Sequence, residues 1–86
     1  MTLKIISTTE VLFEGEVSLV SLPGTNGRFT VLRNHASLIS TLTPGKIGYR
    51  TTETAAAHDN GHYDGQFDVK GGIADIDNNI ISVCIY

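Results

Sequence analysis

Short apolar stretches alternate with turn residues along the whole chain. In residues 28–32 the alternation is strict, which places Phe29 and Val31 on one face of a strand. Short strands separated by frequent turns are typical of an all-β sandwich or barrel. The other predicted strands cover residues 3–6, 11–24, 37–42, 46–50, 66–76 and 79–86, with turns at Glu14-Gly15, Pro44-Gly45 and Asp77-Asn78.

Residues 17–22 depart from strict alternation. We expect Val17, Val20 and Leu22 to be buried, and one face of a strand cannot hold all three without an extra residue. This irregularity predicts a β-bulge near Ser18-Leu19. The interior is expected to hold Phe13, Val17, Val20, Phe29, Val31, Ile73 and Val83. Cys84 is expected to be a core or half-buried residue.

The chain has 86 residues, which is enough for one small domain over residues 1–86 and not for two. Its net charge is −3, with nine acidic and six basic residues, which argues against non-specific binding to nucleic acid. A single cysteine cannot form an internal disulfide and fits a reducing compartment. No apolar stretch approaches the roughly 20 residues of a membrane-spanning helix, so we expect contact with a membrane only through a partner.

His35 is a lone histidine between two strand-like stretches. Catalysis would require a nucleophile or an acid–base partner within hydrogen-bond reach. Ser37 and Ser40 are close in sequence, but no nucleophile motif surrounds them. The favoured interpretation is a structural or interface histidine, and we predict no catalytic residue.

Residues 58–68 contain two histidines and three aspartates, which raises the question of a metal site. A calcium loop requires oxygen ligands at fixed positions and a bidentate glutamate, and this segment lacks that pattern. Structural zinc commonly takes cysteine ligands, and Cys84 has no cysteine companion. A solvated hairpin loop that turns at Asn60-Gly61 or Asp64-Gly65 is the favoured interpretation. The Gly71-Gly72 pair lacks the spacing of a phosphate loop, so we predict neither a metal nor a cofactor.

The residues taken alone therefore predict a binding or scaffolding module and not an enzyme. A free-standing ligand-binding β-module, for example for carbohydrate, is the alternative. Such sites favour exposed aromatic residues on a platform or in a groove. This chain has no Trp and three dispersed tyrosines, at positions 49, 63 and 86, which weakens the alternative.

An ordered series of motifs gives the chain a family resemblance. They are Phe-x-Gly-x-Val within residues 11–17, Pro-Gly-x-x-Gly followed by an Asn-His-Ala corner and Pro-Gly within 20–47, and Gly-Gly-Ile within 71–83. In this series the chain resembles the epsilon subunit of F-type ATP synthases, outside residues 51–66. The resemblance implies a β-sandwich of about ten short, mostly antiparallel strands, a number that the turn spacing also fits.

The resemblance further implies a non-catalytic place in the central stalk, or rotor, which couples ion flow to ATP synthesis. The expected partners are the gamma subunit and the ring of membrane c subunits, at the cytoplasmic face of the bacterial inner membrane. We expect neither nucleic acid nor an obligate homo-oligomer. By position, the loops expected to face the ring at one end of the sandwich contain Gly24, Thr25, Asn26, Gly27, Arg28, Phe29, Asn34 and His35.

The gamma subunit is expected to bind an apolar patch of about 800 Å². Our guesses for that patch are Leu12, Leu42 and Tyr49.

The chain departs from the family pattern in four places. The position of Arg28 is often acidic in the family, so the ring should offer a carboxylate or carbonyls to this chain. Ser37 stands where the family commonly has proline, so the corner loses a fixed φ. Residues 51–66 look longer than the usual hairpin and predict a lengthened one. Family members usually continue into two helices, and an ending at Tyr86 on a strand favours a short form.

Overall fold

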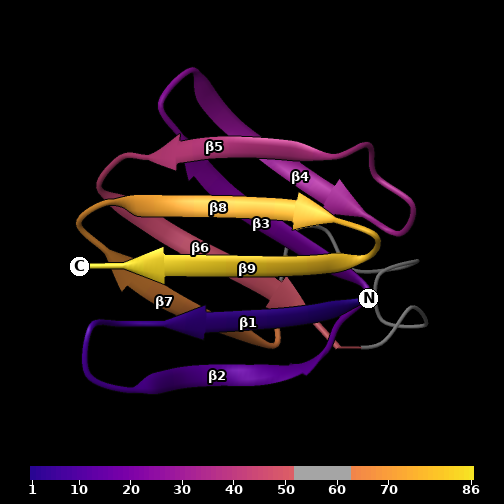
Figure 1. Ribbon diagram of the computed structural model, residues 1–86, viewed down its shortest axis with the longest axis horizontal. Coiled ribbons are helices and arrows are strands. Elements are labelled where there is room, and N and C mark those ends of the chain that lie inside the picture. The colour runs from indigo at the N-terminus through magenta and orange to yellow at the C-terminus, as the bar shows by residue number, and fades with distance from the viewer. Residues whose placement is uncertain (52–62) are drawn as a thin grey trace.

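The computed structural model describes residues 1–51 and 63–86, and these residues form nine strands (Figure 1). The strands confirm the prediction of an all-β fold, with nine in place of about ten. They are β1 (Thr2–Ile6), β2 (Val11–Glu16), β3 (Leu19–Gly24), β4 (Gly27–Leu32), β5 (Leu38–Leu42), β6 (Gly45–Arg50), β7 (Gly65–Val69), β8 (Gly72–Asp77) and β9 (Ile80–Ile85). No helix in the described part of the chain has the length and apolar character needed to cross a membrane.

The strands form two layers that join at one corner. The front layer has the order β5-β8-β9-β1-β2, and the back layer has the order β4-β3-β6-β7. In Figure 1 the front strands run across the picture and the back strands cross behind them. A pairing of Gly24 with Leu42 joins β3 to β5 at the corner. Neighbouring strands are antiparallel except β1 and β9, which are parallel.

The core lies between the two layers and consists of side chains at every second strand position. Val17, Val20, Val31 and Val83 are buried as predicted. The other buried apolar residues are Met1, Leu3, Ile5, Leu22, Leu42, Ile47, Val69, Ala74, Ile76 and Ile81. Phe13 and Phe29 are half-buried and pack against this core.

Two core predictions are wrong, and both concern the hairpin of β8 and β9. Ile73 is 52% exposed, and its cross-strand neighbour Cys84 is also exposed. Alternation in β8 buries Gly72, Ala74 and Ile76, so Ile73 must point outward. Because this strand has apolar residues on both faces, the sequence pattern could not show which face packs against the core.

Two local predictions in residues 11–24 also differ from the structure. Gly15 does not turn the chain, because it lies within β2 and pairs with Leu3. The irregularity after it is a change of layer and not a bulge. The amide of Val17 donates to Met1 O at 2.8 Å, while that of Ser18 donates to Arg50 O at 2.8 Å. Since Val17 bonds to the front layer and Ser18 to the back layer, alternation restarts in β3. The register shift that the structure does show lies between Ile5 and Ile6.

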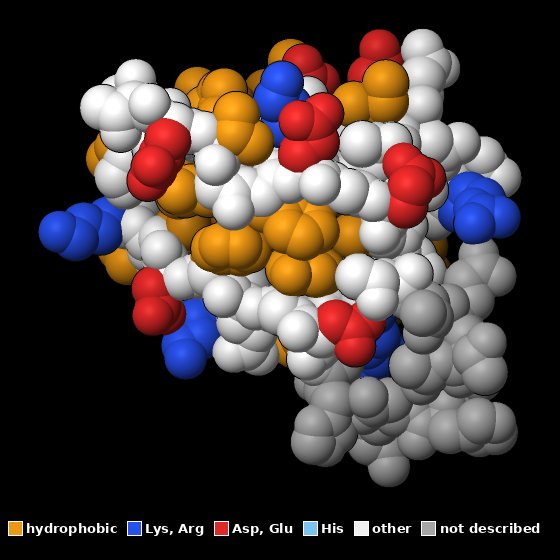
Figure 2. Space-filling model, turned by 90° about the horizontal axis from the view of Figure 1, so that it is seen from below, with side chains coloured by type: hydrophobic (Ala, Val, Ile, Leu, Met, Phe, Trp, Pro, Cys, Tyr) orange, Lys and Arg blue, Asp and Glu red, His pale blue; other side chains and the backbone are white. Residues whose placement is uncertain are grey.

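The side of the sandwich between β2 and β7 is closed by aromatic rings, because these two edge strands do not pair with each other. The ring of Phe13 lies 4.4 Å from that of Tyr49 and 6.2 Å from that of Phe67, between centroids. Figure 2 shows this side, with hydrophobic side chains in its middle and charged ones around them. On this side, contacts between aromatic rings therefore connect the two layers, and no strand pairing does.

Candidate functional site

The predicted ring-facing loop, residues 24–29, is the turn between β3 and β4. The amide of Thr25 donates to Thr41 O at 3.1 Å, and the two threonine hydroxyls lie 3.0 Å apart. Gly27 adopts φ 121°, which favours glycine. Arg28 is exposed and donates from Nη2 to Lys46 O. The loop is thus exposed at its tip and tied to β5 and β6 at its base.

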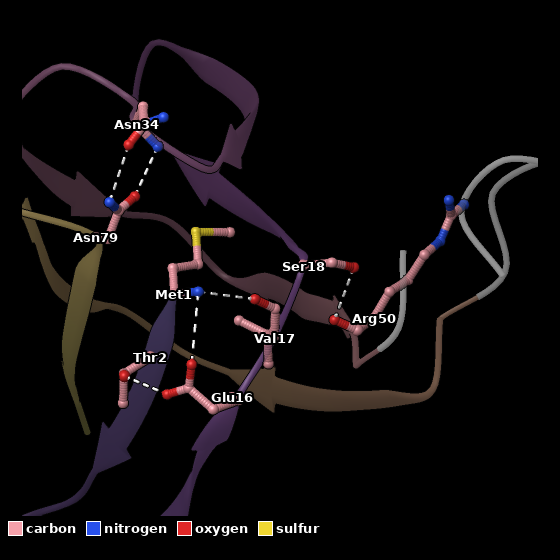
Figure 3. A network of polar contacts seen from close by, with 8 residues as sticks. All are labelled: Met1, Thr2, Glu16, Val17, Ser18, Asn34, Arg50 and Asn79. Atoms are coloured by element: carbon pink, nitrogen blue, oxygen red, sulfur yellow. Dashed lines mark hydrogen bonds and ion pairs between the residues drawn. The ribbon is translucent and has the colours of Figure 1, made fainter. Parts of the chain in front are cut away.

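The His35 corner follows β4 at its other end. Asn34 has φ 65°, a left-handed conformation that asparagine tolerates. The backbone N–H of Asn34 donates to Asn79 Oδ1 at 2.6 Å, and Asn79 Nδ2 donates to Asn34 Oδ1 at 3.0 Å (Figure 3). Ser37 donates from its hydroxyl to Asp77 Oδ1 at 2.6 Å. Asn34 and Ser37 therefore fasten the corner to the β8–β9 hairpin.

The His35 side chain has a structural setting. Its Nδ1 lies 2.6 Å from Ala36 O, and its amide donates to Leu32 O at 3.1 Å. The half-buried ring lies beside apolar side chains that include Met1 and Ile76, and the space between them has no room for a water molecule. His35 is held as part of the corner, in agreement with the structural interpretation of the sequence.

A second polar network surrounds the N-terminus (Figure 3). The ammonium of Met1 donates to Val17 O at 3.3 Å and lies 3.7 Å from Glu16 Oε1. Thr2 donates to Glu16 Oε2 at 2.5 Å. The hydrogen bond from Thr2, helped by the nearby ammonium, lowers the pKa of Glu16 below its ordinary 4.5. The network fastens the start of β1 to the end of β2.

The two predicted ring-facing elements lie at opposite ends of β4, and not at one end of the sandwich (Figure 1). Strand β4 has six residues, so its two ends lie roughly 17 Å apart if it is fully extended. Arg28 and His35 are close in the sequence. Arg28 lies at the start of β4 and His35 lies beyond its end, so the length of the strand separates them.

The residues guessed for the gamma patch lie in two places. Leu42 is only 5% exposed and belongs to the core, so its placement in an exposed patch is wrong. Leu12 and Tyr49 are half-buried and pack against the core from β2 and β6. The gamma contact of these two residues stays a prediction.

Residues 58–62 of the histidine and aspartate segment at 58–68 lie outside the described residues, as does most of the expected hairpin at 51–66. Within the described part, no group of three histidine, cysteine or acidic side chains could hold a metal ion. Asp64 accepts hydrogen bonds at Oδ2 from the amide and hydroxyl of Thr51, at 2.6 and 2.8 Å. These bonds lower the pKa of Asp64 below its ordinary 3.8. Asp64 thus holds the chain after β6.

The three tyrosines do not share a platform of the kind that carbohydrate sites favour. Tyr49 belongs to the aromatic side between β2 and β7, and Tyr63 lies over Gly48 on the back layer. Tyr86 is 79% exposed and lies beside Gly71. The three tyrosines, which are far apart in the sequence, therefore also lie in different parts of the structure.

The outward face of the front layer is a surface that the sequence did not predict. We define it by the outward residues Ile39, Thr41, Ile73, Asp75, Asp77, Ile80, Ser82, Cys84, Thr2, Lys4, Ile6, Val11, Glu14 and Glu16. In β8 and β9, apolar residues occupy both the odd and the even positions, and this was the one sign in the sequence that an outward face could be apolar. Only the burial of Ala74 and Val83 on the inner face identifies their neighbours Ile73 and Cys84 as outward.

These features define a class: a small β-sandwich whose exposed turns and sheet face are suited to contact with other proteins. The family model of the ATP synthase delta/epsilon chain β-sandwich domain matches residues 1–85, and the chain belongs to this family. Its relatives include the ATP synthase epsilon chain of Caulobacter vibrioides, which is 36% identical over 84% of this chain and 73% of the relative. That of Chlorobaculum tepidum is 31% identical over 91% of this chain and 80% of the relative.

Other relatives are longer, and the chain spans only about half of several. It covers 50% of the epsilon chain of Campylobacter lari, at 42% identity over 72% of this chain. The epsilon chain is a non-catalytic subunit of ATP synthase, in agreement with the expectation that this chain is not an enzyme.

Solved structures confirm the fold. A chain of the Tetrahymena thermophila mitochondrial ATP synthase, in a structure of the central stalk and c-ring, matches with a TM-score of 0.76 at 13% identity. The match covers 98% of this chain and 61% of that one. A chain of the Euglena gracilis mitochondrial ATP synthase matches with a TM-score of 0.74 at 19% identity, over 96% and 48% of the two chains.

Proposed function

We propose that the chain is a non-catalytic rotor subunit of an F-type ATP synthase, which binds the gamma subunit and the c-ring. The observation that carries the proposal is the family match over residues 1–85. Two layers packed around a common core make a stiff block, and a subunit that transmits torque must resist bending. Loops anchored on such a block keep their positions while they bind. The chain reaches the cytoplasmic face of the bacterial membrane through the c-ring.

The turn at residues 24–29 is the proposed ring contact. Thr25, Asn26, Gly27 and Arg28 are exposed, whereas the His35 ring is half-buried. The two elements lie at opposite ends of β4. If one end of the sandwich faces the ring, only the element at that end can contact the ring. We assign the ring to the exposed turn and give the His35 corner the role of holding β4 to the β8–β9 hairpin. Arg28 then meets a carboxylate or carbonyls of the ring.

Co-expression with the gamma subunit of the same organism, followed by size-exclusion chromatography, tests the proposal. We expect a complex that survives at micromolar concentration. The absence of a complex would contradict the proposed function.

Binding of variants to the matching detergent-solubilised c-ring tests the ring contact separately. Arg28→Glu should weaken binding because it places a like charge opposite the ring's oxygens. Arg33→Glu makes the same charge change at the other end of β4 and serves as the control. Unchanged or tighter binding of Arg28→Glu would remove Arg28 from the contact.

A further inference from the structure

The turn between β3 and β4 contains an asparagine that is followed directly by glycine, Asn26-Gly27. An asparagine side chain can lose its amide without an enzyme, because the backbone nitrogen of the next residue can attack the side-chain carbonyl carbon. Glycine permits this attack most readily, since it has no side chain to obstruct the approach and its backbone adopts many conformations. The chain has five asparagines, at positions 26, 34, 60, 78 and 79, and the structure describes all of them except the one at position 60.

Asn26 lies at the exposed tip of its turn. Gly24 pairs with Gly27 across the β3–β4 ladder, so Thr25 and Asn26 form a two-residue connection. Thr25 is held by its hydrogen bonds to Thr41. The Asn26 side chain, in contrast, makes no hydrogen bond to any described residue. It is therefore free to rotate toward the backbone nitrogen of Gly27.

Gly27 provides the space that the attack requires. No heavy atom lies within 4 Å of the position that a Cβ on Gly27 would occupy. The Gly27 nitrogen must lose its proton and leave the ladder before it can attack. Because Gly24 and Gly27 are the last pair of the β3–β4 ladder, this step requires opening only at the end of a hairpin, where the free energy of opening is lowest.

The other described asparagines lack this combination. The side chains of Asn34 and Asn79 are held by their two mutual hydrogen bonds, at 2.6 and 3.0 Å. The residues that follow them are His35 and Ile80, whose side chains obstruct the approach to the backbone nitrogen. Asn78 is exposed, but Asn79 and not glycine follows it. Among the described asparagines, only Asn26 has both an unrestrained side chain and a glycine behind it.

We propose that Asn26 is a site of spontaneous deamidation. The Gly27 nitrogen forms a bond to Asn26 Cγ, and the bond from Cγ to Nδ2 breaks. Nδ2 leaves as ammonia and takes up the proton that the Gly27 nitrogen gives up, so that a cyclic imide remains. Water then opens the imide at one of its carbonyl carbons, which leaves aspartate or isoaspartate at position 26. Water is the only co-reactant, and no group is oxidised or reduced.

Either product places a new carboxylate next to Arg28 and changes the net charge of the chain from −3 to −4. Arg28 donates from Nη2 to Lys46 O, and the new carboxylate is a competing and stronger acceptor. Isoaspartate also lengthens the main chain of the two-residue connection by one methylene group. The effect on a partner rests on the proposed function: a turn that meets carboxylates or carbonyls of the ring binds them less well once it carries a negative charge.

Incubation of the folded native chain at mildly alkaline and at mildly acidic pH, followed by tryptic digestion and mass spectrometry, tests the proposal. Cleavage after lysine and arginine separates the asparagines into peptides 5–28, 34–46, 51–70 and 71–86. Peptide 5–28 contains Asn26 and should gain about 1 Da and split into two chromatographic forms. This gain should be on the order of tenfold faster than in peptides 34–46 and 71–86, because hydrogen bonds restrain the side chains of Asn34 and Asn79. It should also be faster at alkaline pH, because the attacking nitrogen must lose its proton.

Asn26→Gln is the matched control, because it keeps the side-chain amide but would have to close a larger and less favourable imide ring. Peptide 5–28 of this variant should keep its mass under the same conditions, and a melting curve establishes that the variant is folded. A peptide 5–28 that stays unmodified in the folded native chain would overturn the proposal. Equal rates of mass gain in peptides 5–28, 34–46 and 71–86 would also overturn it, because the structure would then select no asparagine.

Binding to the matching detergent-solubilised c-ring measures the consequence separately. Asn26→Asp and the incubated native chain should each bind with a Kd raised about three- to fivefold at low salt and by less at high salt. Incubated Asn26→Gln should bind as it does before incubation. A mass gain at Asn26 with unchanged ring binding would support the modification site and contradict the ring contact of this turn. A fresh native chain that binds neither the ring nor gamma would contradict the proposed function, whereas the mass gain would still support the modification site.

Discussion

The Asn34–Asn79 pair allows a sharp prediction, because it fastens the His35 corner to the β8–β9 hairpin. Two hydrogen bonds join the residues, at 2.6 and 3.0 Å. Asn79 also has φ 62°, in the two-residue turn that connects Asp77 to Ile80. Replacing Asn79 by alanine removes both hydrogen bonds and leaves a residue that resists this backbone conformation.

The expected cost of Asn79→Ala follows from these two terms. Two hydrogen bonds near the surface contribute about 1–2 kcal/mol together. The left-handed conformation costs alanine about 1 kcal/mol more than asparagine. The free energy of unfolding should therefore fall by about 2–3 kcal/mol, and Tm by about 10–20 °C for a domain of this size.

Asn78→Ala is the matched control. Asn78 has φ 50° in the same turn but takes no part in the two bonds to Asn34. This variant should lose only the conformational term, about 1 kcal/mol. Urea denaturation followed by circular dichroism measures both variants. Equal losses of stability for the two variants would show that the hydrogen bonds to Asn34 do not stabilise the fold.

Three further predictions concern backbone geometry, pH and a thiol. Gly72→Ala should destabilise the fold by about 2–3 kcal/mol, because φ is 153° and the added Cβ would collide with the carbonyl oxygen of Cys84. Gly27→Ala is the control, because no atom lies near the position of its added Cβ, and it should cost clearly less in the same urea assay. The lowered pKa of Glu16 means that the folded chain binds fewer protons than the unfolded chain near pH 4.5, so stability should fall as the pH drops through that range. Glu16→Gln should flatten this decline in acid denaturation curves, and an unchanged slope would contradict the role of Thr2 and the ammonium. Cys84 should react with a thiol reagent in the folded protein as readily as in urea, since it is exposed; strong protection in the native state would contradict its placement.

Alternation predicted the strands better than it predicted their faces. Residues 28–32 have one apolar face, and the structure buries Val31 and half-buries Phe29 there. In β8 both phases contain isoleucine, Ile73 outward and Ile76 inward, so a pattern of period two could not decide between them. The turn near Asp77-Asn78 was predicted one residue early, because the structure places Asn78 and Asn79 at its centre.

The candidate site was predicted less completely than the fold. The motifs identified the family and the exposed turn at residues 24–29, and the structure shows that turn between β3 and β4. Leu42 was assigned to a surface although it is buried, because strand β5 ends where the two layers join. Short-range patterns contain no information about which layer will cover a residue.

The amino-acid order by itself determined an all-β chain, the approximate strand positions and membership of the epsilon family. These follow from local preferences, from turn residues and from an ordered set of motifs. Only the tertiary structure decided that Arg28 and His35 lie at opposite ends of β4 and that acidic and aliphatic side chains share the front face. The reason is physical: which side chains meet water depends on how strands distant in sequence pair and stack, and a single strand does not specify its neighbours.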